Sequence, residues 1–131
     1  MKKERRIARE LALQYLFPLE MGGEPDSALK KRLQNCQDEI CSYARFLVRG
    51  VMERKEELEE RLSSSSKKNF HSLLPIEKVI LRLGALELLS GLKPSIAINE
   101  AVELAKKYGE PSSFRLINGV LDTLAKSLKE V

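Results

Sequence analysis

Basic side chains crowd the first ten residues of the chain, which read MKKERRIARE. Five of the first nine residues are positively charged and one is negatively charged; the five are Lys2, Lys3, Arg5, Arg6 and Arg9. Over the rest of the chain basic and acidic residues cancel, so this segment accounts for the whole formal net charge of +4. A charge excess gathered in one place predicts an anionic partner: a nucleic acid, an anionic membrane surface or an acidic protein.

Helical geometry indicates how these charges are arranged. At about 100° per residue, four of the five cations fall within an arc of about 100°, and Ile7 and Leu11 fall on the other side. These four form a stripe: Lys2, Arg5, Arg6 and Arg9. The helix dipole disfavours cations in the first turn by about 0.3–1 kcal/mol each, so a purely solvated helix would more naturally begin with Asp or Glu. Composition alone leaves a solvated helix start and an anion-binding face equally open.

The arginines of the stripe favour RNA if the partner is a nucleic acid. A planar guanidinium can grip a phosphate with two hydrogen bonds and can stack on a base. Few aromatic side chains near the stripe are available for base stacking. Tyr15 points toward the core side, and only Phe17, at the edge of the stripe, could offer a stacking platform. A membrane-binding amphipathic helix is the competing interpretation, but its apolar face is needed for helix packing and contains no tryptophan.

The sequence offers little for catalysis or metal binding. Its single histidine, His71, stands alone, whereas metal sites require clustered ligands. Glu100 and Glu103 could share a helix face as paired carboxylates. Glu103, however, can reach Lys106 and Lys107, which is typical of a salt-bridged solvent face. Phosphate-binding glycine loops and G-x-S-x-G sequences are absent from the chain, so we predict a binding protein that is not an enzyme and uses no cofactor or metal.

The two cysteines and the hydropathy pattern indicate the compartment. Cys36 and Cys41 fit neither a C-x-x-C redox pair nor a zinc-ligand spacing, so reduced thiols are expected. No apolar run approaches the roughly 18 residues of a membrane span, and no signal-peptide core follows the basic start. These features predict a soluble protein of the cytoplasm.

Apolar spacing and strong helix formers predict an all-α fold, because no stretch alternates with a period of two. Six helices are expected, over about 3–17, 27–36, 38–62, 75–89, 96–108 and 112–128. Pro18 is expected to end or kink the first helix, and the apolar fourth helix is expected to be central and most buried. Gly84 and Gly119, inside helices, indicate close approach of another backbone or of a ligand, and close helix packing is the commoner cause.

The serine-rich segment SSSSKKN, residues 63–69, is the most linker-like stretch of the chain. We interpret residues 63–74 as a loop between two sub-bundles, over about 1–62 and 75–131, that share one core. A chain of 131 residues suits one domain that buries roughly two thirds of its unfolded-chain surface. The predicted architecture is a single-domain helical bundle of about six to seven helices in two sub-bundles.

Four segments, in their order and spacing, resemble the NusB family of transcription antitermination factors: RRIARELALQYLF, IEKVILRLGALELL, AINEAVELAKKYG and NGVLD. The resemblance covers essentially the whole chain. Its most specific part is AINEAVELAKKYG with NGVLD beginning nine residues after the glycine. It implies an all-helical NusB-like fold of two sub-bundles with three or four helices each.

The resemblance also implies a function. Proteins similar to this one pair with NusE, which is also a ribosomal protein of the small subunit, and the heterodimer binds single-stranded boxA RNA in nascent ribosomal RNA leaders. With other Nus factors this lets RNA polymerase read through terminators, and some relatives form homodimers. The expected function is therefore transcription antitermination through RNA binding. The alternative is a helical module that docks on proteins, or a homodimer, without direct RNA binding.

The family pattern, carried onto this sequence together with the basic start, gives a set of expected RNA-binding residues. They are Lys2, Lys3, Arg5, Arg6, Arg9, Arg115 and Asn118. Among them, Arg115 replaces a lysine that is common in the family. Ile7 stands where some relatives have another arginine, but it lies roughly opposite the stripe, so the main row of cations is expected to remain intact.

A second set of residues is expected to contact the partner protein: Phe17, Glu77 and Arg82. Phe17 occupies a position where tyrosine is frequent, and Glu77 matches a glutamate at the start of the fourth helix. Arg82 stands on the same mostly apolar helix, where a charge is either exposed near an end or paired. His71 aligns near a second acidic contact of the relatives and is not acidic.

Overall fold

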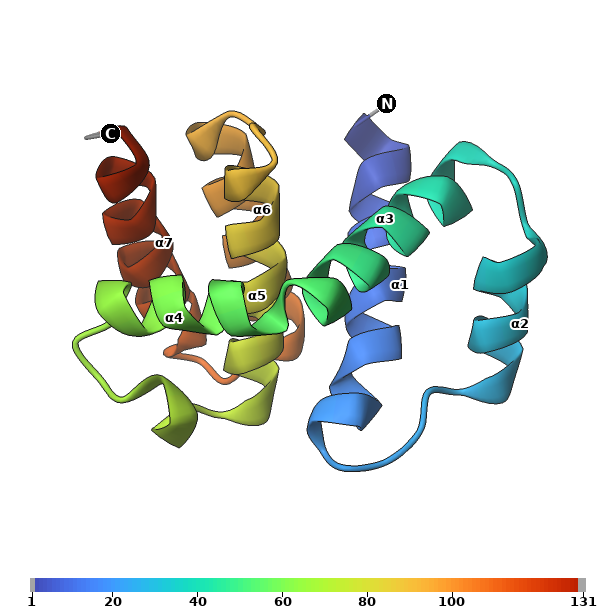
Figure 1. The fold of residues 1–131 in the computed structure, drawn as a ribbon, viewed down its shortest axis with the longest axis horizontal. Helices are drawn as coiled ribbons and strands as arrows, with labels where there is room; N and C mark the ends of the chain where they lie inside the picture. The colour runs from blue at the N-terminus through green and yellow to red at the C-terminus, as the bar shows by residue number, and fades with distance from the viewer. Residues whose placement is uncertain (1, 130–131) are drawn as a thin grey trace.

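The computed structural model describes residues 2–129, which form helices joined by loops (Figure 1). Over this range the elements are α1 (Lys2–Glu20), α2 (Ser27–Asn35), α3 (Glu39–Glu53), α4 (Lys55–Ser65), the 3₁₀ helix η1 (Phe70–Ser72), α5 (Pro75–Leu89), α6 (Pro94–Tyr108) and α7 (Ser113–Lys129). The described residues contain no strand, which confirms the all-α prediction. Every helix within 2–129 falls short of the length or apolar character that crossing a membrane requires.

The helices gather in two groups, with α5 at the centre. In Figure 1, α1, α2 and α3 occupy one half of the molecule, and α4 to α7 occupy the other. Helix α5 packs against α1, α3, α4, α6 and α7, and its side chains from Val79 to Leu88 are all buried. One hydrophobic core runs through both groups. The prediction that this apolar helix is central is confirmed.

The segment predicted as one long helix over 38–62 is two helices in the structure. Arg54 leaves helical geometry, with φ of −110° and ψ of 22°, and separates α3 from α4. Helix α3 packs mainly on α1, whereas α4 packs on α5 and α7 and buries Leu58 and Leu62. One straight helix could not cover both groups, so the chain bends at Arg54. Helix α4 therefore lies in the second group, and the predicted division at residues 63–74 falls too late in the chain.

Helix α1 continues through Pro18 to Glu20 instead of ending at Phe17. Proline lacks the N–H that would bond to a carbonyl one turn earlier, yet the residues after it remain helical. Gly22 then turns the chain with a φ of 83°, and the N–H of Gly23 donates to the Pro18 carbonyl at 2.9 Å. The helix is thus ended by a glycine in the left-handed region, and not by the proline.

Gly84 and Gly119 have opposite surroundings and provide a matched pair of tests. A Cβ on Gly84 would lie 2.6 Å from Cδ1 of the buried Leu121, whereas a Cβ on Gly119 would meet nothing within 4 Å. We expect Gly84→Ala to lower the free energy of unfolding by about 1–3 kcal/mol through overpacking. Gly119→Ala should raise it by about 0.5–1 kcal/mol. Urea unfolding measures both changes, and a shift of the same sign in the two variants would contradict the packing argument.

Candidate nucleic-acid interface

The exposed end of α1 carries three cations, which we call the basic tip: Lys2, Lys3 and Arg5. Within residues 2–129, none of the three pairs with a carboxylate. The Arg5 guanidinium carbon lies 4.3 Å from the ring centre of Tyr43 on α3. Apart from that contact, the charges of the basic tip face solvent and are available to an anion.

Arg6 and Arg9 enter an ion-pair network with two buried glutamates. Arg6 Nε and Nη2 donate to the two carboxylate oxygens of Glu100 on α6, at 2.9 and 2.7 Å. Arg9 Nε donates to Glu87 on α5 at 2.9 Å, and Arg9 Nη1 donates to Glu100 at 3.3 Å. The Tyr43 hydroxyl also donates to Glu87. These five residues, the arginine–glutamate network, connect α1 with α3, α5 and α6.

Burial separates the roles of the two arginines. The Arg9 side chain is 4% exposed and the Arg6 side chain 46%. The angular spacing of the predicted stripe holds, but α5 and α6 cover Arg9, so Arg9 positions other residues and is not an exposed RNA contact. Glu100 is buried as well, which corrects its assignment to a solvent face. Glu103 does lie on that face, with Lys106 at 3.9 Å.

The network also fixes the ionisation of its members. The hydrogen bond from Arg6 and the attraction of its charge hold the pKa of Glu100 below its ordinary value. Burial, reinforced by the hydrogen bond to Glu87, raises the pKa of Tyr43 to about 12. Near neutral pH the Glu100 carboxylate is therefore charged and the Tyr43 hydroxyl keeps its proton, so both sets of hydrogen bonds persist.

We expect the Glu100 ion pair to make the folded protein less stable in acid. A carboxyl whose pKa is lower in the folded state stabilises folding above the unfolded value of about 4.3, and this contribution is lost as the pH falls through the folded value. Urea unfolding at about pH 7 and about pH 4 measures the effect. In Glu100→Gln the free energy of unfolding should differ less between the two pH values than in the unaltered protein. An equal difference would contradict the role of the Glu100 ion pair in acid stability.

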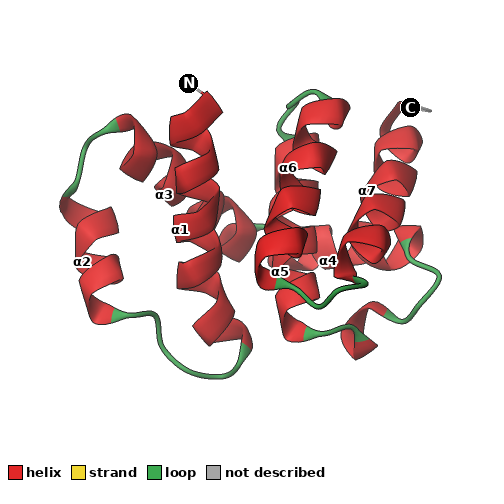
Figure 2. Cartoon of the chain, turned by 180° about the vertical axis from the view of Figure 1, so that it is seen from behind, coloured by secondary structure: helices red, strands yellow, loops and turns green. Residues whose placement is uncertain are grey.

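A surface groove between α1 and α6 is lined by Arg6 and Arg9 and by the carboxylates of Glu100 and Glu103. Its walls include Glu10, Lys106 and Lys107. Lys107 Nζ pairs with Glu10 at 2.7 Å, while Lys106 Nζ lies 5.5 Å from the ring centre of Phe114 on α7. In Figure 2, α6 lies between α1 and α7. The groove therefore runs between the basic half of α1 and α6, and only Lys106 at its edge comes near the first turn of α7.

Arg115 and Asn118 are exposed on the first turns of α7, beyond the Lys106 end of the groove. The Arg115 guanidinium carbon lies 5.5 Å from the Phe114 ring centre, and Lys106 lies over the same ring. Arg115 therefore lies near the Lys106 end of the groove, although the lining of the groove comes from α1 and α6 and includes no residue of α7 within the described chain. Lys106 and Phe114 were not predicted as site residues, although an aromatic side chain next to Arg115 was a visible signal.

Glu77 and Arg82 have partners inside the protein. Glu77 is 7% exposed; its Oε1 accepts the N–H of Leu74 at 3.1 Å, and its Oε2 accepts the Ser113 hydroxyl at 2.7 Å. Arg82 is 5% exposed; it donates to Glu20 on α1 at 2.5 Å and to a second glutamate on α4 at 2.8 Å. These contacts correct the expectation that the two charges face a partner protein. Glu77 caps the first turn of α5 and connects it to α7 through Ser113. Arg82 on α5 forms ion pairs with α1 and α4.

Phe17 lies near the other end of α1 from the basic tip. Its side chain is half-buried and packs on the core. A rise of about 1.5 Å per residue puts it about 18 Å along the helix from Arg5, too far to stack a base held there. Phe17 keeps an accessible edge and stays a predicted protein contact. His71 is exposed in η1.

Cys36, Asp38 and Cys41 are the one group of three potential metal ligands among residues 2–129, with ligand atoms within 4.8 Å of one another. Asp38 Oδ1 accepts the N–H of Cys41 at 2.8 Å and caps the start of α3. Burial raises the pKa of the Cys41 thiol to about 11. Structural zinc sites use four ligands and deprotonated thiols. This group offers three ligands, and its Cys41 thiol resists ionisation. We therefore interpret Asp38 as the cap of α3 and not as a metal ligand.

Comparison with known proteins finds relatives along nearly the whole chain. The NusB family matches residues 6–126. The transcription antitermination protein NusB of Bdellovibrio bacteriovorus is 38% identical over 129 residues, which cover 94% of this chain and 96% of that protein. NusB of Desulfitobacterium hafniense is 36% identical over 135 residues, which cover 96% of this chain and 90% of that protein.

Solved structures share the fold. NusB in a complex of the antitermination factors NusB and NusE with double-stranded RNA matches with a TM-score of 0.83 and 26% identity, over 97% of this chain and 99% of that one. T. maritima NusB matches with a TM-score of 0.81 and 30% identity, over 93% and 90% of the two chains. The family match and the identity to full-length relatives agree with the helical architecture, and the chain belongs to the NusB family of transcription antitermination proteins.

Proposed function

We propose that this protein is a transcription antitermination factor that acts with NusE. The pair binds single-stranded boxA RNA in the leaders of nascent ribosomal RNA and promotes processive transcription by RNA polymerase. The proposal is supported by family membership and by the related structure that holds NusB, NusE and RNA in one complex. The protein works in the cytoplasm by binding and not by catalysis, and other Nus factors and RNA polymerase are its indirect partners.

The basic tip is the observation that carries the proposal. Three exposed cations without carboxylate partners in the described chain keep their charge available for phosphates. Neutralising phosphates releases counterions, which supplies much of the affinity of proteins for RNA. Arg6 adds a fourth, partly exposed guanidinium whose position is fixed by Glu100. Arg115 and Asn118, exposed on α7 beyond Lys106, are proposed as further RNA contacts.

The NusE contact is proposed at the opposite end of α1, around Phe17. Its position in the family pattern supports this placement, and so does its distance from the basic tip. Because the two ends of α1 are separate, RNA and NusE can bind at the same time. Phenylalanine supplies an apolar contact there without the hydroxyl that a tyrosine would offer.

Titration of a labelled boxA RNA with this protein, with NusE and with both proteins together tests the proposal. Native mass spectrometry identifies the species, and a scrambled RNA of equal length is the control. We expect one copy of each protein on one RNA, with higher affinity than either protein has alone. A complex of the two proteins that binds no RNA would favour a protein-docking module, and a homodimer that binds neither would contradict the proposal.

A further inference from the structure

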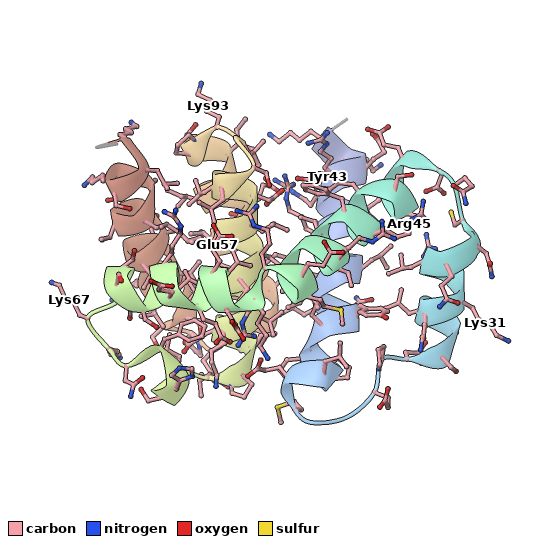
Figure 3. The ribbon with its side chains drawn as sticks, viewed as in Figure 1. Lys31, Tyr43, Arg45, Glu57, Lys67 and Lys93 are labelled. Atoms are coloured by element: carbon pink, nitrogen blue, oxygen red, sulfur yellow. The ribbon has the colours of Figure 1, made fainter. Side chains whose placement is uncertain are left out.

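Phe46 on α3 is an exposed aromatic side chain close to the basic tip. Its side chain is 45% exposed, and its ring stacks on that of Tyr43, with ring centres 5.6 Å apart and planes inclined by 24°. Figure 3 labels Tyr43 on α3, beside the N-terminal half of α1. We call the two stacked rings the aromatic step. Offset stacking of this kind leaves the outer face of the exposed ring free for a third planar group.

The Tyr43 ring is held firmly in place. Its hydroxyl donates to Glu87, which Arg9 also binds. The guanidinium carbons of Arg5 and Arg9 lie 4.3 and 5.8 Å from its ring centre. Since the arginine–glutamate network fixes Tyr43, it also fixes the surface on which Phe46 rests. A rigid aromatic surface binds a planar ligand with little loss of side-chain entropy.

Cations and small groups surround the aromatic step. One hollow beside it is lined by Arg5, Ser90 and Gly91, with Leu92 as its other apolar residue and Glu87 at its base. The negative charge of Glu87 is matched by Arg9. The large apolar side chains of this hollow are therefore Tyr43, Phe46 and Leu92, fewer than the repeated apolar positions by which the face of a partner helix is bound.

A second hollow, on the other side of Phe46, holds three arginines and Glu53. Arg45 is engaged by the backbone carbonyls of Leu33 and Cys36, and Arg54 by Glu57. Arg49 is exposed, and within residues 2–129 it has no carboxylate partner. The step is thus flanked by one available guanidinium on each side, Arg5 and Arg49.

We propose that the aromatic step of Tyr43 and Phe46 is a stacking site for an unpaired nucleobase of the bound RNA, with Arg5 and Arg49 on the flanking phosphates. The inference rests on the proposed RNA binding and adds a second strand-binding surface on α3, on the side of α1 away from the α6 groove. Single-stranded RNA is commonly held by bases stacked on aromatic rings within a basic surface. Ser90 lines the same hollow and contributes a polar side chain beside the stacked rings.

Fluorescence of boxA RNA that carries 2-aminopurine at one position at a time tests the site. Stacking on Phe46 should quench the probe at one position in the unaltered protein and leave it bright in Phe46→Leu. Phe46→Leu should also weaken binding about fivefold to tenfold, which is about 1–1.4 kcal/mol and lies at the lower end of what base stacking on a ring contributes. Phe46→Tyr keeps the ring and should retain quenching and affinity. Met52→Ala removes another exposed apolar side chain of α3 and should change neither.

An abasic scan of the same RNA separates the possible outcomes. Removing the stacked base should cost affinity in the unaltered protein but nothing more in Phe46→Leu. Tight, salt-dependent RNA binding with the same affinity and quenching in Phe46→Leu would overturn the stacking site and leave the proposed function standing. Failure of the unaltered protein to bind RNA at all would overturn both. Loss of NusE binding in Phe46→Leu with unchanged RNA affinity would make the step a protein contact and overturn the inference.

Discussion

Replacing Arg9 with methionine is expected to lower the free energy of unfolding by about 3–5 kcal/mol. Methionine fills the space of the side-chain stem, but it leaves the buried Glu87 carboxylate with Tyr43 as its remaining hydrogen-bond donor. Glu100 keeps Arg6 and is less affected. Breaking one side of a buried ion pair is costly because the other charge stays in a medium that solvates it poorly. Urea unfolding at neutral pH measures the loss.

A double-mutant cycle provides the control for this substitution. Glu87→Gln in the Arg9→Met background removes the unpaired charge, so the double variant should regain part of the lost stability. Arg54→Met is a matched surface control, because the Arg54–Glu57 pair is exposed on both sides and should contribute about 1 kcal/mol or less. Equal effects of Arg9→Met and Arg54→Met, or additive effects in the cycle, would contradict the structural role of Arg9.

The arginine stripe shows what helical periodicity can predict from sequence and what it cannot. Spacing alone places Arg5, Arg6 and Arg9 on neighbouring angles of one helix, and that arrangement is retained. Whether a position on that helix is open depends on which elements pack there. Arg9 meets Glu87 and Glu100 across separations of 78 and 91 residues. Contacts over such separations carry no local signal, so the stripe was predictable and the burial of its last member was not.

The break at Arg54 and the course of α1 through Pro18 have similar causes. The apolar pattern continues from Val51 to Leu58 with nearly helical spacing, so nothing local marks the change of direction between α3 and α4. The bend arises because α3 covers α1 while α4 covers α5 and α7. At Pro18 the local signal is real, but packing of the flanking Phe17 and Leu19 on the core holds the last turn in helical form.

The aromatic step was partly visible in the sequence. Tyr43 and Phe46 are three residues apart, which places them on one face of a helix. Their proximity to the basic tip, however, follows from the packing of α3 on α1. The sequence alone left Phe17 as the only aromatic candidate, because Tyr15 points toward the core, yet Phe17 lies about 18 Å from Arg5 along the helix. Sequence therefore identified the charges of the site, and tertiary packing selected the aromatic partners.

Removing the charges of the basic tip is expected to cause the largest loss of RNA affinity. The triple variant Lys2→Ala, Lys3→Ala and Arg5→Ala leaves the arginine–glutamate network intact and should fold normally. Each lost phosphate contact should reduce the slope of log affinity against log salt by about 0.7, so the slope should flatten by up to about 2. Filter binding of boxA RNA over a range of salt concentrations measures the slope and the affinity together.

The matched control lies on α2, where Lys30, Lys31 and Arg32 form an exposed basic group of the same composition. Figure 3 shows Lys31 at the outer side of the molecule, far from the N-terminal end of α1. Alanine at all three positions lowers the net charge by the same amount as the basic-tip variant. If RNA binds through total charge, the two triple variants will lose affinity equally, which would contradict a localised site. If the basic tip is the interface, the α2 variant will keep most of the salt slope, because charges beyond about one Debye length, roughly 8–10 Å, are screened from the bound strand.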